Sequence, residues 1–125
     1  MDEVLKQLVT MSRNLGDPAM DCVILGEGNT SALADADTFW VKASGHQLPS
    51  IDHTGFVRVS LARALAILDD AALTDDEIKQ RLIEAKVDPE TGVGPAPHNG
   101  IRPSTETVFH AICLSLEGVN FVGHT

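Results

Sequence analysis

Three short polar segments carry the side chains best suited to chemistry. Gly28-Asn29-Thr30-Ser31 and Ser44-Gly45 combine glycine, which lets a ligand approach the backbone, with amide and hydroxyl groups that can hydrogen-bond to it. Pro103-Ser104-Thr105-Glu106 places hydroxyl and N–H groups at an expected helix start, where an anion can bind. Each segment taken alone also fits a plain turn or a helix cap. The chemistry that the three suggest is the binding of an anion.

Two histidines could add to this chemistry. His124 ends a β-prone run, and a histidine at the tip of a strand can bind a metal. A single histidine makes no metal site, because such a site needs three or four ligands. His110 lies four residues after Glu106 and therefore on the same helix face. For His110 we favour a hydrogen-bonded packing role over a ligand role.

Helices and strands alternate along the chain and must position these segments. In the first half of the chain, the patterns predict a helix over 3–15, strands over 30–34 and 38–42 joined by a hairpin, a loop over 44–55 and a strand over 56–59. A helix capped by Ser60 and a helix after a Thr74 to Glu77 capping box are expected next. A loop over 86–103, a helix from about 104 to 116 and a strand over 119–124 complete the chain. An apolar run at 22–25 is expected to lead into the first strand. This mixture indicates an α/β or α+β fold with some antiparallel pairing.

Composition limits the partners. The 125 residues make one domain, 1–125, and the net charge of -9 argues against non-specific nucleic-acid binding and against an anionic membrane surface. The sequence has neither a signal-peptide pattern nor an apolar run near the roughly 20 residues that span a bilayer. We expect a cytoplasmic protein with reduced thiols. Because the last predicted strand stops at Gly123-His124-Thr125, the chain is expected to be truncated at its C-terminus.

In their order and spacing, the polar segments and the final His124-Thr125 resemble the class II (zinc-dependent) aldolase/adducin family. The resemblance covers about residues 3–125, and the last motif looks like the family's His-x-His cut before its second histidine. It implies a three-layer α/β/α domain with a mostly antiparallel central sheet. It also implies a homo-tetramer with active sites near subunit boundaries.

The resemblance further implies roles for single residues. The groups that would bind the phosphate of a phosphorylated sugar are Gly28, Asn29, Ser44, Gly45, Ser104 and Thr105. Glu106 would be the general acid/base, and His124 would be the first of three histidines that hold Zn²⁺ or another divalent metal, the other two lying beyond Thr125. The metal would polarise a ketose carbonyl and Glu106 would move a proton at the reacting carbon.

Two functions stay open at this point. One is a metal-dependent aldolase-type lyase, or a related epimerase or dehydratase, for which these 125 residues alone are expected to be inactive. The other is a non-catalytic, adducin-like oligomerisation or interaction domain. Retained Glu106 and His124 favour the enzyme. Leu33, where aldolases often carry a basic residue, and the long stretch from Asp69 to Gly100 depart from compact aldolases and leave the substrate open. The parent protein is expected to be larger, as in members fused to a dehydrogenase domain.

Overall fold

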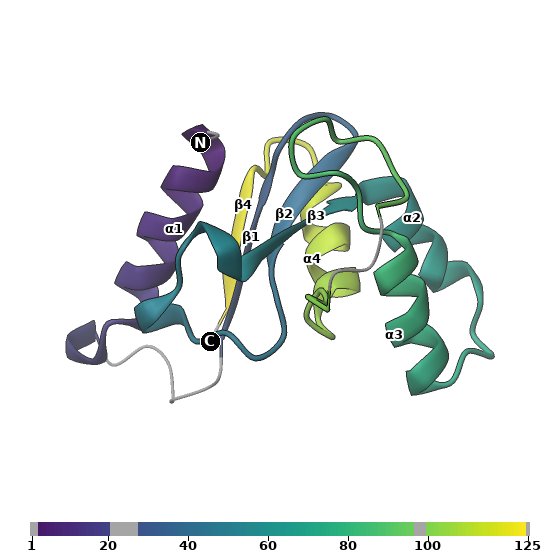
Figure 1. Ribbon diagram of the computed structural model, residues 1–125, viewed down its shortest axis with the longest axis horizontal. Helices are drawn as coiled ribbons and strands as arrows, with labels where there is room; N and C mark the ends of the chain where they lie inside the picture. Colours follow the sequence, from purple (N-terminus) through teal and green to yellow (C-terminus); the bar gives the residue numbers. More distant parts are fainter. Residues whose placement is uncertain (1–2, 21–27, 97–99, 125) are drawn as a thin grey trace.

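An antiparallel sheet with helices on both faces forms the centre of the molecule (Figure 1). The computed structural model describes residues 3–20, 28–96 and 100–124. The strands are β1 (Asn29–Leu33), β2 (Thr38–Lys42), β3 (Phe56–Ser60) and β4 (Phe121–His124). Their order in the sheet is β3-β2-β1-β4, and each neighbouring pair is antiparallel. The mixed α/β class with antiparallel pairing that the sequence predicts is thus confirmed.

The helices cover the sheet from opposite sides, as Figure 1 shows. They are α1 (Glu3–Gly16), α2 (Leu61–Ala66), α3 (Asp75–Glu84) and α4 (Thr107–Leu114). Leu5 and Leu8 of α1 pack with Trp40 in one apolar cluster. Ala111 and Leu114 of α4 belong to a second cluster, together with residues of α2 and the sheet. The sheet therefore separates two apolar cores.

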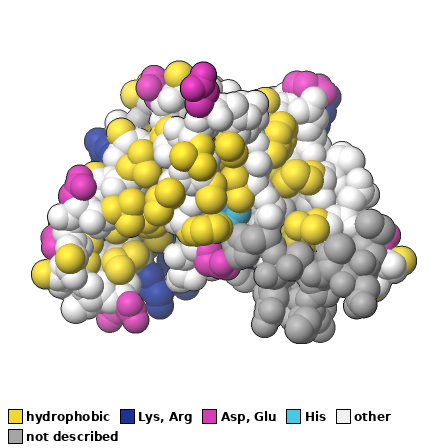
Figure 2. Space-filling model, turned by 180° about the vertical axis from the view of Figure 1, so that it is seen from behind, with side chains coloured by type: hydrophobic (Ala, Val, Ile, Leu, Met, Phe, Trp, Pro, Cys, Tyr) yellow, Lys and Arg dark blue, Asp and Glu magenta, His cyan; other side chains and the backbone are white. Residues whose placement is uncertain are grey.

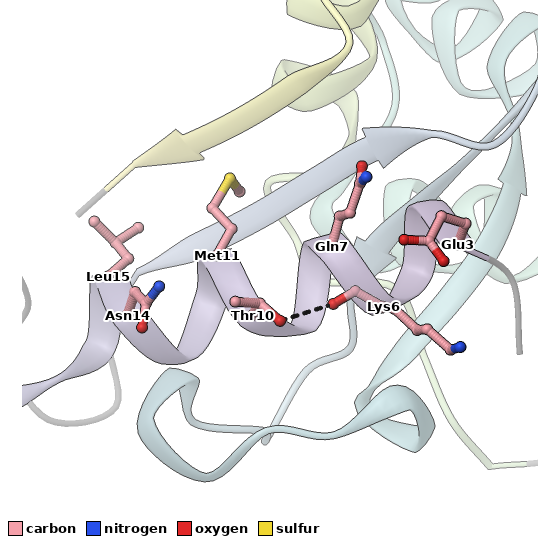
Figure 3. A pocket seen from close by; sticks show the side chains of 7 residues that line it. All are labelled: Glu3, Lys6, Gln7, Thr10, Met11, Asn14 and Leu15. Carbon is pink, nitrogen blue, oxygen red and sulfur yellow. Dashed lines mark hydrogen bonds between the residues drawn. The ribbon is translucent and has the colours of Figure 1, made fainter.

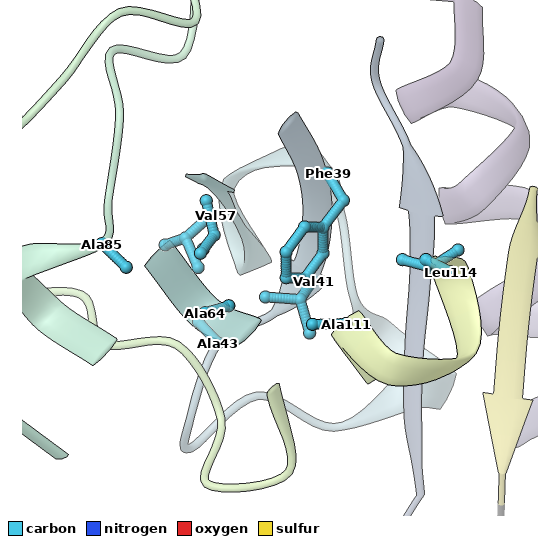
Figure 4. Packing of buried hydrophobic residues seen from close by; sticks show 9 residues of the cluster. Phe39, Val41, Ala43, Val57, Ala64, Ala85, Ala111 and Leu114 are labelled. Atoms are coloured by element: carbon cyan, nitrogen blue, oxygen red, sulfur yellow. The ribbon is translucent and has the colours of Figure 1, made fainter. Parts of the chain in front are cut away.

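Strand β2 contributes to both cores because successive side chains of a strand point to opposite faces. Phe39 and Val41 lie in the cluster with α4, where Figure 4 shows them close to Ala111, while Trp40 packs on the side of α1. All five residues of β2 are buried. This explains why the strand reads as a nearly continuous apolar run rather than as an alternating one.

Side-chain caps fix where α2 and α3 begin. The Ser60 hydroxyl accepts a hydrogen bond from the Arg63 N–H at 3.2 Å. Thr74 and Glu77 form the reciprocal capping box, in which each side chain bonds the other residue's backbone N–H. Both predicted caps are confirmed. Helix α2 is short, because a 3-10 turn over Ile67–Asp69 follows it directly.

The loop predicted over 86–103 is confirmed for its described residues, whereas the predicted start of the last helix is wrong. Residues 86–103 contain no regular element among those described, but Lys86 bridges to Val59 and Pro103 bridges to Ala43, so both ends are tied to the sheet. Helix α4 begins at Thr107, three residues later than predicted. The reason is a long-range contact, since the Ser104 N–H donates to the Lys42 carbonyl at 3.1 Å and so extends the sheet. The apolar run at 22–25 lies outside the described residues.

None of the helices in the described ranges has the length and apolar character that crossing a bilayer requires.

Candidate functional site

Backbone pairing brings the polar segments to one end of the sheet. Because neighbouring strands are antiparallel, the start of β1 lies beside the ends of β2 and β4. Asn29, the first residue of β1, is paired in register with His124, the last residue of β4. Ala43, just past β2, bridges to Pro103. Residues that are up to 95 positions apart in the sequence thus meet at this end of the sheet.

A buried pair, Asn29 and Ser104, forms the inner part of the site. Asn29 is 1% exposed, and its Nδ2 donates a hydrogen bond to the Ser104 hydroxyl. The same hydroxyl accepts from the Glu106 N–H at 3.2 Å. The other amide atom, Asn29 Oδ1, is buried and has no hydrogen-bond partner among the described residues. A buried acceptor left in this way costs about 1–3 kcal/mol, so its presence points to a ligand rather than to packing.

Ser44, Gly45 and Thr105 form the outer part of the site, and all three are exposed. The Ser44 N–H donates to the Arg102 carbonyl at 2.9 Å, which holds the turn after β2 against the segment before α4. Gly45 has a φ of +85°, a left-handed conformation that favours glycine. Gly28, at the entrance to β1, has a φ of 93°. Both glycines are therefore required by the backbone at the edges of the site.

Ser44 and Thr105 also line a small polar hollow of about 110 Å³ together with Lys79, Arg102 and Pro103. The residues predicted to bind an anion thus fall into two groups. Asn29 and Ser104 are buried and bonded to each other, whereas Ser44 and Thr105 face the solvent-accessible hollow.

Lys42 belongs to this end of the sheet and was missed by the sequence reasoning. It is only 6% exposed, and its Nζ donates to the carbonyls of His46 at 2.6 Å and Ala43 at 3.2 Å, which stand on either side of Ser44-Gly45. Burial lowers the pKa of the Lys42 ammonium from its ordinary value, and the charge of Glu106 opposes that shift. The signal in the sequence was a lysine at the end of an apolar strand, directly before the Ser-Gly turn.

Glu106 lies immediately before α4 rather than within its first turn. It is exposed, and its side chain makes no capping hydrogen bond to the helix. Its electrostatic influence on Lys42 places its charge near that ammonium. An exposed carboxylate is open to contact with a ligand, as a general acid or base must be.

His110 is a packing residue, as predicted. It is fully buried, and its Nδ1 pairs with the Ser31 hydroxyl at 2.5 Å. Phe109 contacts the ring edge to face, with centroids 5.8 Å apart. The bond to Ser31 joins α4 to β1, while the contact with Phe109 lies within α4 itself.

The predicted metal ligand His124 is placed by its backbone alone, beside Asn29, and its side chain lies outside what the structure describes. Within the described ranges, no group of three His, Cys, Asp or Glu side chains could hold a metal ion. A catalytic zinc site takes three protein ligands. These residues therefore do not form a metal centre by themselves, and the role of His124 stays a prediction.

A more spacious hollow, of about 620 Å³, lies elsewhere, along α1 beside β4 (Figure 3). Its lining includes Lys6, Met11 and Leu15, and it contains none of the residues singled out above. Its surface is mainly apolar and widely open. Size alone does not make it a site, and the polar end of the sheet remains the candidate.

Comparisons with known proteins concern the family and the fold of the chain. Residues 6–125 match the family model described as the class II aldolase and adducin N-terminal domain. A solved structure, the N-terminal class II aldolase domain of a conserved protein from Thermoplasma acidophilum, is similar, with 30% sequence identity and a TM-score of 0.74. The similarity covers 98% of this chain and 55% of that one, so the chain spans about half the length of that relative. No curated protein matches the sequence.

Proposed function

The chain belongs to the class II aldolase and adducin N-terminal domain family, and from that premise we propose that it carries the substrate-binding end of a metal-dependent aldolase-type lyase acting on a phosphorylated sugar. A related epimerase or dehydratase would use the same end of the sheet. The observation that carries the proposal is the meeting of the Asn29–Ser104 pair, the Ser44-Gly45 turn and Glu106 in one place.

The anion-binding part rests on donors from separate segments. Ser44 and Thr105 line the polar hollow, and the Ser44 hydroxyl, which donates to the Pro103 carbonyl at 3.4 Å, would turn from it to donate to an anion. At Gly45, no described atom outside its chain neighbours lies within 4 Å of where a side chain would begin, so the backbone there is open. A phosphate group has oxygens in several directions, so donors from different segments suit it better than a single cap would. Holding the phosphate would fix the position of the reacting carbon relative to Glu106.

Asn29 can also serve the substrate through its unpartnered amide atom. As oriented, Oδ1 is free to accept a hydrogen bond from a sugar hydroxyl. The Ser104 hydroxyl can donate as well as accept, so the amide can turn over, pair Oδ1 with Ser104, and present Nδ2 as a donor to a phosphate oxygen. In either orientation one buried polar atom of Asn29 has no partner among the described residues and could bond to the substrate.

Glu106 is the proposed acid/base. Aldol cleavage converts a hydroxyl of the substrate into an aldehyde carbonyl, with release of the hydroxyl proton to solvent, and breaks the adjacent carbon–carbon bond. The electron pair of that bond stays on the carbon beside the ketone carbonyl, where a proton must be added to complete the product. The exposed carboxyl of Glu106 can deliver that proton, and in the reverse direction it removes it.

A divalent metal would polarise the substrate carbonyl in a lyase of this kind. His124, at the end of β4 beside Asn29, is the proposed first ligand. The remaining ligands would lie outside the described residues.

A second candidate function is a non-catalytic assembly domain. Large hydrophobic side chains are exposed at Phe109 and Ile112 of α4, at Leu116 just beyond it, and at Phe121 of β4. Figure 2 shows hydrophobic side chains gathered across one face of the molecule. Such a surface is typical of subunit contacts, and it supports the proposed homo-tetramer whether or not the protein is an enzyme.

The test is turnover of a panel of ketose phosphates by the full-length protein, with Glu106→Gln as the variant. The loss of general acid/base catalysis should lower kcat about 10²- to 10⁴-fold while the metal content is unchanged. Glu117→Gln, which removes another exposed carboxylate beyond α4, is the matched control and should keep full activity. Near-normal turnover by Glu106→Gln would remove Glu106 from this role. An assembled wild-type protein that turns over none of the panel would favour the assembly domain.

A further inference from the structure

Among the described residues that line the polar hollow beside Ser44, two are cations and none is an acid. Lys79 comes from α3, Arg102 from the segment that precedes α4, and Ser44 and Thr105 complete the polar lining. This is notable in a chain with 18 Asp and Glu against 9 Lys and Arg, because a random hollow would more often contain a carboxylate. At about 110 Å³ the hollow exceeds the roughly 30 Å³ that one water occupies in the liquid, and it has room for a group larger than water.

Neither cation forms an ion pair with a side chain in the described part of the chain. The ion pairs found in the described part of the chain join Arg58 to Asp35 and Arg81 to Asp70, and neither includes Lys79 or Arg102. The contrast with Arg81 is informative, because it lies two residues after Lys79 on the same helix and has an acidic partner at 3.8 Å. The backbone carbonyl of Arg102 is used, by the Ser44 N–H, so the segment that carries the guanidinium is held in place.

We propose that Lys79 and Arg102 bind the anionic group of the substrate, and that this group is a phosphate monoester carrying two negative charges. The inference rests on the proposed function, because it supplies the charged ligands for the same anion site. Two cations match the two negative charges of a phosphate dianion better than they match the single charge of a carboxylate. Arginine can meet two phosphate oxygens with parallel N–H groups, lysine adds a point charge, and the hydroxyls of Ser44 and Thr105 fill other directions.

The proposal gives a role to the part of the sequence that departs from compact aldolases. Helix α3 lies within the long stretch from Asp69 to Gly100, and its start is fixed by the Thr74–Glu77 capping box. That stretch thereby brings Lys79 to a hollow whose other residues are Ser44 of the Ser-Gly turn and the run from Arg102 to Thr105. The extra helix is thus a specificity element that selects for charge at the end of the substrate.

Calorimetric titration with inorganic phosphate tests this directly. Lys79→Gln and Arg102→Gln should each weaken phosphate binding about fivefold, and the double variant more than tenfold, given the usual size of exposed charge contacts. The dependence of affinity on ionic strength should also flatten in the double variant, which a purely structural role would not cause. Arg81→Gln, on the same helix, and Lys6→Gln, on α1, are matched controls that should bind phosphate as the wild type does. All four positions are exposed, so thermal unfolding should not change.

The outcomes separate this inference from the proposal on which it rests. If phosphate binding is lost in a Ser44→Ala, Thr105→Val double variant but unchanged in both cation variants, the anion site stands and the role of Lys79 and Arg102 is wrong. If the controls weaken binding as much as the cation variants do, the effect is one of overall charge, and the inference again fails. If the wild-type protein binds no phosphate, both the anion site and its cations are refuted.

Discussion

Replacing Asn29 with leucine should weaken ligand binding without weakening the fold. Leucine has the same number of side-chain heavy atoms as asparagine and the same branching, so the change creates little or no cavity. It removes the hydrogen bond from Nδ2 to Ser104, while the Ser104 hydroxyl keeps its bond from the Glu106 N–H. It also removes the buried Oδ1 that has no partner in the described part of the protein.

The expected magnitude follows from these two contacts. Losing one neutral hydrogen bond costs about 1 kcal/mol, and removing a buried, unsatisfied acceptor returns about 1–3 kcal/mol. The free energy of unfolding of Asn29→Leu should therefore lie between that of the wild type and a value about 2 kcal/mol higher. Phosphate affinity should fall at least about tenfold, since the amide can no longer donate to the anion or order Ser104.

Ser31→Ala is the matched control, two residues along on the same face of β1. It removes the hydroxyl that pairs with Nδ1 of the fully buried His110 at 2.5 Å, and should lower the free energy of unfolding by about 1–3 kcal/mol. Urea denaturation measures both variants, provided the slope with urea is unchanged. If Asn29→Leu is instead destabilised by as much as Ser31→Ala, then Asn29 is a packing residue and the interpretation of its free amide atom is wrong.

Two further predictions concern Lys42 and Gly16. Burial lowers the pKa of Lys42 below its ordinary 10.5. At a pH between the pKa of the folded state and 10.5, the unfolded chain therefore binds more protons at Lys42 than the folded chain does. As pH rises through that window, the free energy of unfolding of the wild type should increase relative to that of Lys42→Met. The chain has no tyrosine that would titrate in the same window. Urea denaturation at a series of alkaline pH values measures the difference in unfolding free energy between the two proteins, and a difference that falls or stays flat would contradict the reasoning. At Gly16 an added Cβ would lie 2.6 Å from Leu48 Cβ and 2.7 Å from the Pro49 nitrogen, so Gly16→Ala should destabilise the fold by about 2 kcal/mol or more through overpacking. Gly45→Ala, where no atom lies within 4 Å, should cost only the roughly 1–2 kcal/mol of a left-handed backbone, and equal losses at the two positions in thermal unfolding would argue against the tight contact at Gly16.

Local features of the fold could be predicted from the sequence because their causes are local. The Ser60 cap and the Thr74–Glu77 capping box each involve residues three positions apart, and both form as expected. The hairpin between β1 and β2 likewise connects neighbouring strands across a short turn. His110 could be identified as a packing residue because buried, hydrogen-bonded histidines are the commoner case on a helix face.

Features that depend on distant segments could not be predicted in this way. The start of α4 was placed too early because the Ser104 N–H is taken by the Lys42 carbonyl, 62 positions away in the chain. The Lys42 ammonium bonds the carbonyls on both sides of the Ser44-Gly45 turn. These bonds could be predicted only if the conformation of the turn were already known. Lys79 and Arg102 have no local signature at all, since only tertiary packing brings α3 beside the segment before α4.

The central claim is that the Gly-Asn, Ser-Gly and Pro-Ser-Thr-Glu segments form one anion-binding site. The most direct measurement is a phosphate titration of the isotopically labelled protein followed by the chemical shifts of its amide groups. We predict saturable shifts at the backbone amides of Ser44, Gly45 and Thr105 and at the side-chain amide of Asn29, all with one dissociation constant. The amides along the α1 hollow, at Met11 and Leu15, should not move. Shifts that cluster on α1, or that give different dissociation constants for Asn29 and Ser44, would contradict the account.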